Sequence, residues 1–110
     1  MASLTPKTLF VGNTSGANVY TANSTSGNYT IIKNISVCNA NNSTTKSVTI
    51  KIIAPAGSAA ENNLYISDLY IPASNVVQID TNLILSNGYS IYMSHNGNVT
   101  TTISGVEYLG

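Results

Sequence analysis

Short runs of β-branched and aromatic residues alternate with polar residues along most of the chain. In one such run the apolar residues Val48, Ile50 and Ile52 are separated by Thr49 and Lys51. Side chains of a strand point alternately to opposite faces, so this two-residue period predicts strands with one buried face. No segment shows the 3.6-residue period of an amphipathic helix. The pattern predicts about eight strands, at residues 8–11, 18–21, 29–39, 48–53, 64–71, 77–85 (one strand or a strand pair), 89–93 and 99–103, followed by a break in phase at Ser104 and Gly105 and a closing strand at 106–109.

Turn-forming residues between the runs predict how the strands are joined. Asn96 and Gly97 lie between two alternating runs, which is the strongest short-range signal for a β-hairpin. Pro55 and Pro72 each follow a run, and they indicate strand ends because proline has no N–H to donate to a ladder. The sequence therefore predicts short antiparallel strands joined by tight turns.

The run at 29–39 does not keep a single phase. Tyr29 and Ile31 fall on one face, Lys33 interrupts that face, and Ile32 is assigned to the other face. We therefore expect a β-bulge near Lys33 and Asn34.

These elements predict an all-β fold with no obligatory helix. An antiparallel two-sheet β-sandwich fits best, either jelly-roll-like or Ig-like. We expect an extended N-terminal arm at residues 1–7 and a single β-sandwich domain at residues 8–110. The expected core consists of the inward apolar residues of each run: Ile31, Ile35, Val37, Val48, Ile50, Ile52, Val77, Ile79, Leu83, Leu85, Ile91, Val99 and Ile103.

The composition is polar but carries almost no charge. Asn, Ser and Thr make up more than a third of the residues, while there are only four Lys, no Arg and four acidic side chains. Four scattered lysines give no basic patch for phosphates, so nucleic-acid binding is not expected. No apolar run approaches the roughly 20 residues of a membrane span. The N-terminus lacks the apolar stretch of a signal peptide, which favours synthesis and folding in a cytoplasm.

Titratable side chains are too few and too scattered to indicate a reaction. His95 is the single imidazole and sits at the predicted hairpin, without neighbouring ligands. Cys38 is the single cysteine and is expected to be a small buried hydrophobe. We therefore expect no catalytic residues, no metal and no cofactor. Seven tyrosines leave open a sugar-binding face, although ordinary strand and interface positions are favoured for them.

Four segments resemble the pattern of small structural proteins of tailed bacteriophages. They are IIKNISVCN at 31–39, VTIKI at 48–52, LILSNGYSIY at 83–92 and ISGVEY at 103–108. This resemblance spans nearly the whole chain and rests on β-structural motifs. It implies a virion component without enzymatic activity, located in the particle after assembly in the host cytoplasm.

The resulting hypothesis is a capsid decoration (cement) protein that stabilises the phage head. Its partners would be copies of itself and other virion proteins, the major capsid protein first. The alternative is a neck or tail accessory module that attaches fibres or binds host glycan, and a third reading is a small hydrolase or lyase. Candidate subunit contacts are residues of the N-terminal arm and apolar residues assigned to outward faces: Leu4, Pro6, Ile32, Ile53 and Tyr92.

Overall fold

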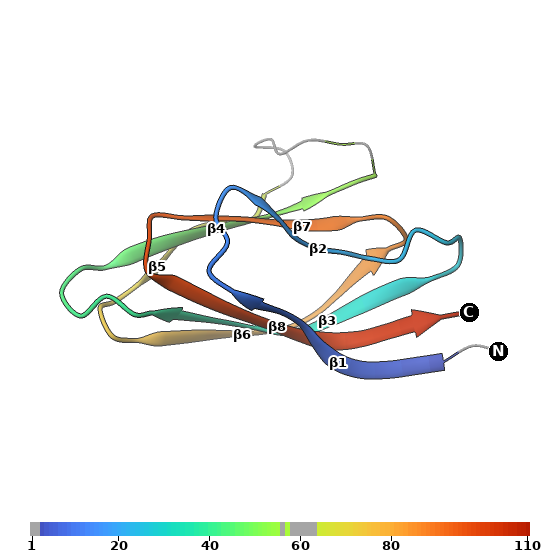
Figure 1. Cartoon of the computed structure of the whole chain (residues 1–110), viewed down its shortest axis with the longest axis horizontal. Coiled ribbons are helices and arrows are strands. Elements are labelled where there is room, and N and C mark those ends of the chain that lie inside the picture. Colours follow the sequence, from blue (N-terminus) through green and yellow to red (C-terminus); the bar gives the residue numbers. More distant parts are fainter. Residues whose placement is uncertain (1–2, 56, 58–63) are drawn as a thin grey trace.

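The computed structural model describes residues 3–55, 57 and 64–110, and within these residues the fold is entirely β. The predicted number of strands is confirmed (Figure 1). The described part of the chain has no helix long and apolar enough to cross a lipid bilayer. The strands are β1 (Ser3–Gly12), β2 (Ala17–Thr21), β3 (Tyr29–Asn39), β4 (Lys46–Ile53), β5 (Leu64–Ile71), β6 (Val76–Ser86), β7 (Ser90–His95) and β8 (Val99–Leu109).

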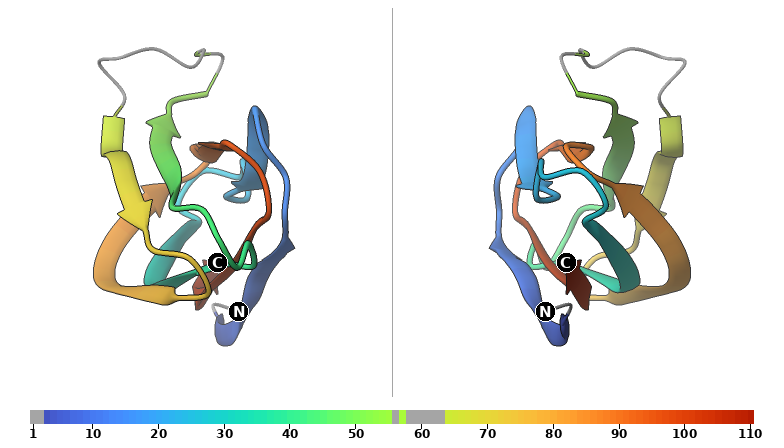
Figure 2. Two further views of the ribbon diagram at one scale, coloured as in Figure 1. Left: turned by 90° about the vertical axis from the view of Figure 1, so that its left-hand side faces the viewer. Right: turned by 90° about the vertical axis from the view of Figure 1, so that its right-hand side faces the viewer.

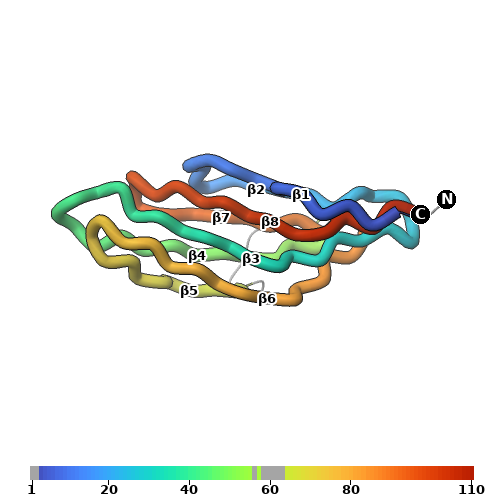
Figure 3. The backbone as a smooth tube through the Cα atoms, turned by 90° about the horizontal axis from the view of Figure 1, so that it is seen from below, coloured from blue at the N-terminus to red at the C-terminus, as the bar shows by residue number. Residues whose placement is uncertain are grey.

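The strands form two antiparallel sheets of four, in the orders β1-β8-β3-β6 and β2-β7-β4-β5. The predicted two-sheet β-sandwich is therefore confirmed. The two layers are seen edge-on in Figure 1, and Figure 3 shows each strand of one sheet lying over a strand of the other. Strand pairs β1·β8, β2·β7, β3·β6 and β4·β5 are those of a long antiparallel ribbon wrapped on itself, which is the jelly-roll topology.

The predicted hairpin at Asn96 and Gly97 is wrong, because the strands that it joins lie in different sheets. β7 pairs with β2 and β4, whereas β8 pairs with β1 and β3. The side chain of Asn96 accepts a hydrogen bond from the backbone N–H of Ser47 at 3.1 Å, which ties the connection to β4. The chain does turn at Asn96 and Gly97, as the turn signal predicts. The two strands that this turn joins nevertheless pair with distant strands and not with each other.

The expected N-terminal arm is part of the sandwich in the structure. Ser3 to Lys7 are the first half of β1 and pair with β8 of the same chain, from Ser3 opposite Leu109 to Lys7 opposite Gly105. Main-chain pairing, rather than the burial of apolar side chains, holds this segment, since its side chains are exposed. That is why the alternation of apolar residues gave no sign of a strand there.

The core lies between the two sheets and is built from the inward residues of every strand except β1 and β2, which contribute only partly buried side chains. Eight of the expected core residues are fully buried: Ile35, Val37, Val48, Ile50, Leu85, Ile91, Val99 and Ile103. The other five, Ile31, Ile52, Val77, Ile79 and Leu83, are only partly buried. Burial of apolar surface between the layers is the main stabilising term of such a fold.

The bulge expected in β3 is confirmed, and it reverses the assignment of faces before it. The register of β3 with both neighbours shifts between Ile32 and Asn34. Ile32 is consequently fully buried, whereas Ile31 lies on the outer face opposite Ile84. An extra residue changes the parity of every position on one side of it.

Two of the expected subunit contacts are therefore buried within the chain itself. Ile32 has no exposed surface, and Ile53 is only 5% exposed. The turn after β4 lies beside Ile53, since a Cβ atom at Gly57 would come within 3.2 Å of Cγ2 of Ile53. The prediction that these two residues face a neighbour is wrong.

Candidate functional site

The remaining expected contacts lie on the outer faces of different sheets. Leu4 is 62% exposed and Pro6 is also exposed, both on β1. Tyr92 is half-buried on β7, with the ammonium of Lys51 5.6 Å from its ring centroid. The structure thus does not gather the predicted residues into one site, but Leu4 and Pro6 lead to a surface that sequence reasoning missed.

This surface is the outer face of the β1-β8-β3-β6 sheet at the end where the two termini lie (Figure 1). Residues paired directly across antiparallel strands point to the same face, so the register defines rows of neighbouring side chains. One row runs Leu4, Tyr108, Tyr29 and Ser86, and the next runs Pro6, Val106, Ile31 and Ile84. None of these side chains carries a charge.

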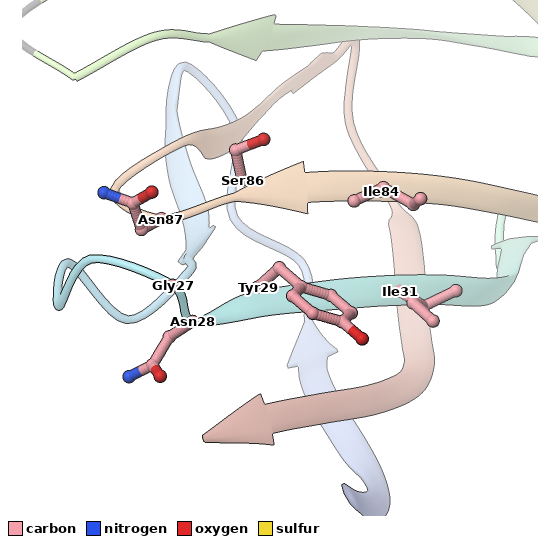
Figure 4. A pocket seen from close by; sticks show the side chains of 7 residues that line it. All are labelled: Gly27, Asn28, Tyr29, Ile31, Ile84, Ser86 and Asn87. Carbon is pink, nitrogen blue, oxygen red and sulfur yellow. The ribbon is translucent and has the colours of Figure 1, made fainter. Parts of the chain in front are cut away.

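A cavity of about 400 Å³ opens in this face between the start of β3 and the end of β6. We call it the Tyr29 notch. Its wall consists of Tyr29, Ile31 and Ile84, which lie side by side on the two strands (Figure 4). Its rim comes from two turns, at residues 27–28 and 86–87.

Neighbouring groups hold the notch in shape. The rings of Tyr29 and Tyr108 are stacked with centroids 4.8 Å apart and an angle of 12° between their planes. The amide of Asn28 donates to Asn23 Oδ1 at 2.8 Å, and its Oδ1 accepts from the backbone N–H of Gly110 at 2.8 Å. The aromatic wall and one side of the rim are therefore fixed before any ligand binds.

A second apolar surface follows the edges of the sheets. Among the described residues, every large exposed hydrophobic side chain lies on one of the edge strands β1, β5 and β6. β5 and β6 form the same flank of the sandwich, as the end views in Figure 2 show, and the hydroxyls of Tyr65 and Thr81 link them at 2.8 Å. We define the β5–β6 flank by Leu64, Tyr65, Tyr70 and Val76, which are 42%, 38%, 67% and 52% exposed.

A polar cluster links the two sheets through side chains of β1, β2, β3 and β8. Tyr20 of β2 donates to the carboxylate of Glu107, which also forms an ion pair with Lys7 at 3.0 Å. The hydroxyl of Tyr20 is 2.8 Å from that of Thr30.

Burial, followed by the hydrogen bond to Glu107, raises the pKa of Tyr20 to about 12. The hydrogen bond from Tyr20, followed by Lys7, lowers the pKa of Glu107. The cluster joins three strands by charge-assisted hydrogen bonds.

His95 has a structural role in the connection between β7 and β8. Its Nδ1 accepts a hydrogen bond from the backbone N–H of Gly97 at 3.0 Å, so its Nε2 donates to the carbonyl of Asn13 at 2.9 Å. Cys38, expected to be buried, is half-buried on β3, opposite Val76 of the edge strand β6. No group of three or more His, Cys, Asp or Glu side chains that could hold a metal ion occurs in residues 3–55, 57 and 64–110.

The notch residues were missed because the expected bulge was not applied to the assignment of faces, so that Ile31 stayed in the expected core with Ile35 and Val37. With Lys33 treated as the extra residue, Tyr29 and Ile31 move to the outer face, where Ile84 and Tyr108 join them. The signal was present in the sequence, since a lysine in an inward position predicts a bulge. Which side of the bulge changes face is decided by the buried Ile35 and Val37 beyond it.

Comparison of the chain with protein-family models, curated proteins and solved structures finds no match.

Proposed function

We propose that this protein is a non-enzymatic structural subunit of a bacteriophage particle, a decoration protein that binds outside the head and stabilises the capsid. Three properties support the proposal. The four phage-like segments fall on β3, β4, β6, β7 and β8 of the sandwich. Jelly rolls build many viral shells, although they also occur in lectins and enzymes, so the fold is an analogy only. The third property is the surface of the edge strands.

The observation that carries the proposal is the exposure of apolar side chains along the edge strands. Soluble monomers protect sheet edges with charges, because an open edge pairs with other chains. Here each of the two edge strands carries one exposed carboxylate, Asp68 and Asp80, and the β5–β6 flank also presents Tyr65, Tyr70 and Val76 to solvent. Such a surface is typical of subunits that meet neighbours in an assembly. With a net charge of zero, little repulsion opposes those contacts.

The decisive experiment measures how many copies of the chain a purified particle contains. Quantitative mass spectrometry should give a number that matches the capsid lattice, and imaging should place a labelled chain on the outer surface of the head. A low number that matches a single vertex would favour the alternative of a neck or tail module. Absence of the chain from purified particles would overturn both.

A binding assay tests the flank itself. Particles that lack the protein are incubated with purified chain, and bound protein is measured by co-sedimentation. We expect Tyr70→Ser combined with Val76→Ser to weaken binding, whereas Val11→Ser, on the opposite edge and 62% exposed, serves as the matched control. Binding should change little between low and moderate salt, because the contacts are uncharged.

A further inference from the structure

The Tyr29 notch has the chemistry of a small-ligand site. All seven of its lining residues are uncharged: Gly27, Asn28, Tyr29, Ile31, Ile84, Ser86 and Asn87. A charged ligand group would lose its hydration there without gaining a partner, so the notch favours a neutral ligand. Its volume of about 400 Å³ lies within the range of small-molecule sites.

The wall of the notch favours an apolar part of the ligand, and the rim favours a polar part. Tyr108 stacks on one face of the Tyr29 ring from the β8 side, which leaves the face toward β6 to border the cavity. An aromatic face next to aliphatic side chains fits a flat apolar surface. At the rim, Nδ2 of Asn87 donates to the carbonyl of Ser24 at 3.5 Å, whereas the hydroxyl of Ser86 and Oδ1 of Asn87 form no hydrogen bond with any described residue.

We propose that the Tyr29 notch binds one ring of a neutral sugar. A pyranose has an apolar C–H face and a border of hydroxyls, which matches an aromatic wall with a polar rim. Tyr29 would stack on the ring, Ile31 and Ile84 would contact its edge, and Ser86 with Asn87 would hydrogen-bond its hydroxyls. This site does not depend on where the protein sits in a particle.

The size of the notch fits one ring of a small ligand. The notch spans β3, β6 and the turns beside them, and neighbouring strands lie only about 4.8 Å apart. A stable protein–protein contact buries roughly 800 Å² on each partner, so a protein partner would also have to cover the neighbouring rows of this sheet face. The fixed position of Asn28 at the rim lowers the ordering that a small ligand would require.

The test is a ¹H–¹⁵N NMR titration of the full chain with the methyl glycosides of glucose, galactose and N-acetylglucosamine. At least one should shift the amides of Gly27, Asn28, Tyr29, Ser86 and Asn87, with a Kd of about 1 mM for a single ring. Methyl glucuronide should bind more weakly than its neutral counterpart. Tyr29→Ala should weaken binding by about tenfold or more, the size of one lost aromatic contact. Tyr70→Ala, which removes an exposed tyrosine elsewhere, should leave binding unchanged.

A second variant tests the proposal without removing Tyr29, whose loss could impair folding. Ile84 is 60% exposed, so Ile84→Trp should fold and block the notch. Sugar binding that survives Ile84→Trp would overturn the proposal, as would the absence of shifts with all three neutral glycosides. The proposal would also be wrong if the same amides shifted with protein concentration alone, because a second copy would then cover the notch. Tyr29→Ala should still bind particles, so failure of the sugar site leaves the decoration hypothesis untouched.

Discussion

At the scale of single residues, one buried asparagine side chain forms hydrogen bonds with several backbone groups. Asn39 has no exposed surface, and its amide donates to the carbonyls of Thr44 and Ile71 at 2.9 Å each. Its Oδ1 accepts from the backbone N–H of Asn41 at 2.9 Å. The side chain therefore joins the loop after β3 to the turn after β5, and it is the kind of buried polar group that remains stable only while fully bonded.

Asn39→Ala should strongly destabilise the fold, because it leaves the buried carbonyl of Ile71 and the partly buried N–H of Asn41 without this partner. Each buried polar group left without a partner lowers the free energy of unfolding by about 1–3 kcal/mol. The free energy of unfolding measured in urea provides the test. Asn82→Ala is the matched control, since Asn82 is exposed and, among the described residues, its side chain bonds only that of Lys33, so a change within about 0.5 kcal/mol is expected. Equal effects of the two substitutions would contradict the role of Asn39.

Gly105 of β8 lies tightly against the backbone of β3. A Cβ atom at this position would overlap the carbonyl oxygen of Ile31, next to the bulge in β3. Gly105→Ala should therefore destabilise the protein by more than about 3 kcal/mol, because backbone rather than a flexible side chain must move. Gly27→Ala is the comparison: nothing lies within 4 Å of its Cβ position, but its φ of 87° is positive. That strain alone amounts to about 1–2 kcal/mol, so a smaller loss for Gly105→Ala than for Gly27→Ala would refute the clash.

At the scale of elements, the bulge in β3 decides which isoleucine is structural. Ile32→Ala should lower the free energy of unfolding by about 2–5 kcal/mol, since Ile32 is fully buried between the sheets. Ile31→Ala should lower it much less, because Ile31 lies on the outer face at the Tyr29 notch. Thermal and urea unfolding of the two variants tests the pair. The reverse order would mean that the register shift lies elsewhere.

The same element shows what the sequence can and cannot predict. Alternation located the strands and correctly assigned the inward residues of β4 and β8, such as Val48 and Ile103. It failed at the start of β3 because one extra residue reverses the parity of all positions before it. The hairpin predicted from Asn96 and Gly97 was wrong for another reason. A turn signal is local, whereas the partners of β7 and β8 are set by pairing with distant strands. The Tyr29 notch depends on the bulge in β3 and on the pairing of β3 with the distant strand β6, so no local motif predicts it.

At the scale of the whole molecule, stability should depend on pH through the cluster that joins β1, β2 and β8. Glu107 has a folded pKa below its ordinary value of 4.5, so its contribution is complete above pH 4.5 and disappears as pH falls through the folded pKa. Tyr20 has a pKa raised from 10.0 to about 12, so its contribution is complete below pH 10 and is lost as pH rises toward 12. The free energy of unfolding should therefore have a plateau between these limits and decline on both sides.

Glu107→Gln separates this cluster from other sources of pH dependence. Without a carboxylate to protonate, the decline on the acid side should become shallower than in the unaltered chain. The alkaline decline should move to lower pH, because the hydrogen bond to Glu107 helps to keep Tyr20 neutral. Asp80 offers a matched control, since it is an exposed carboxylate of the same sheet that accepts a hydrogen bond from the amide of Asn34. Urea unfolding of both variants across the pH range is the measurement. If Asp80→Asn makes the acid decline in the free energy of unfolding as shallow as Glu107→Gln does, the cluster is not the specific source of that decline. The pH dependence would then come from the carboxylates in general and not from the contacts of Glu107.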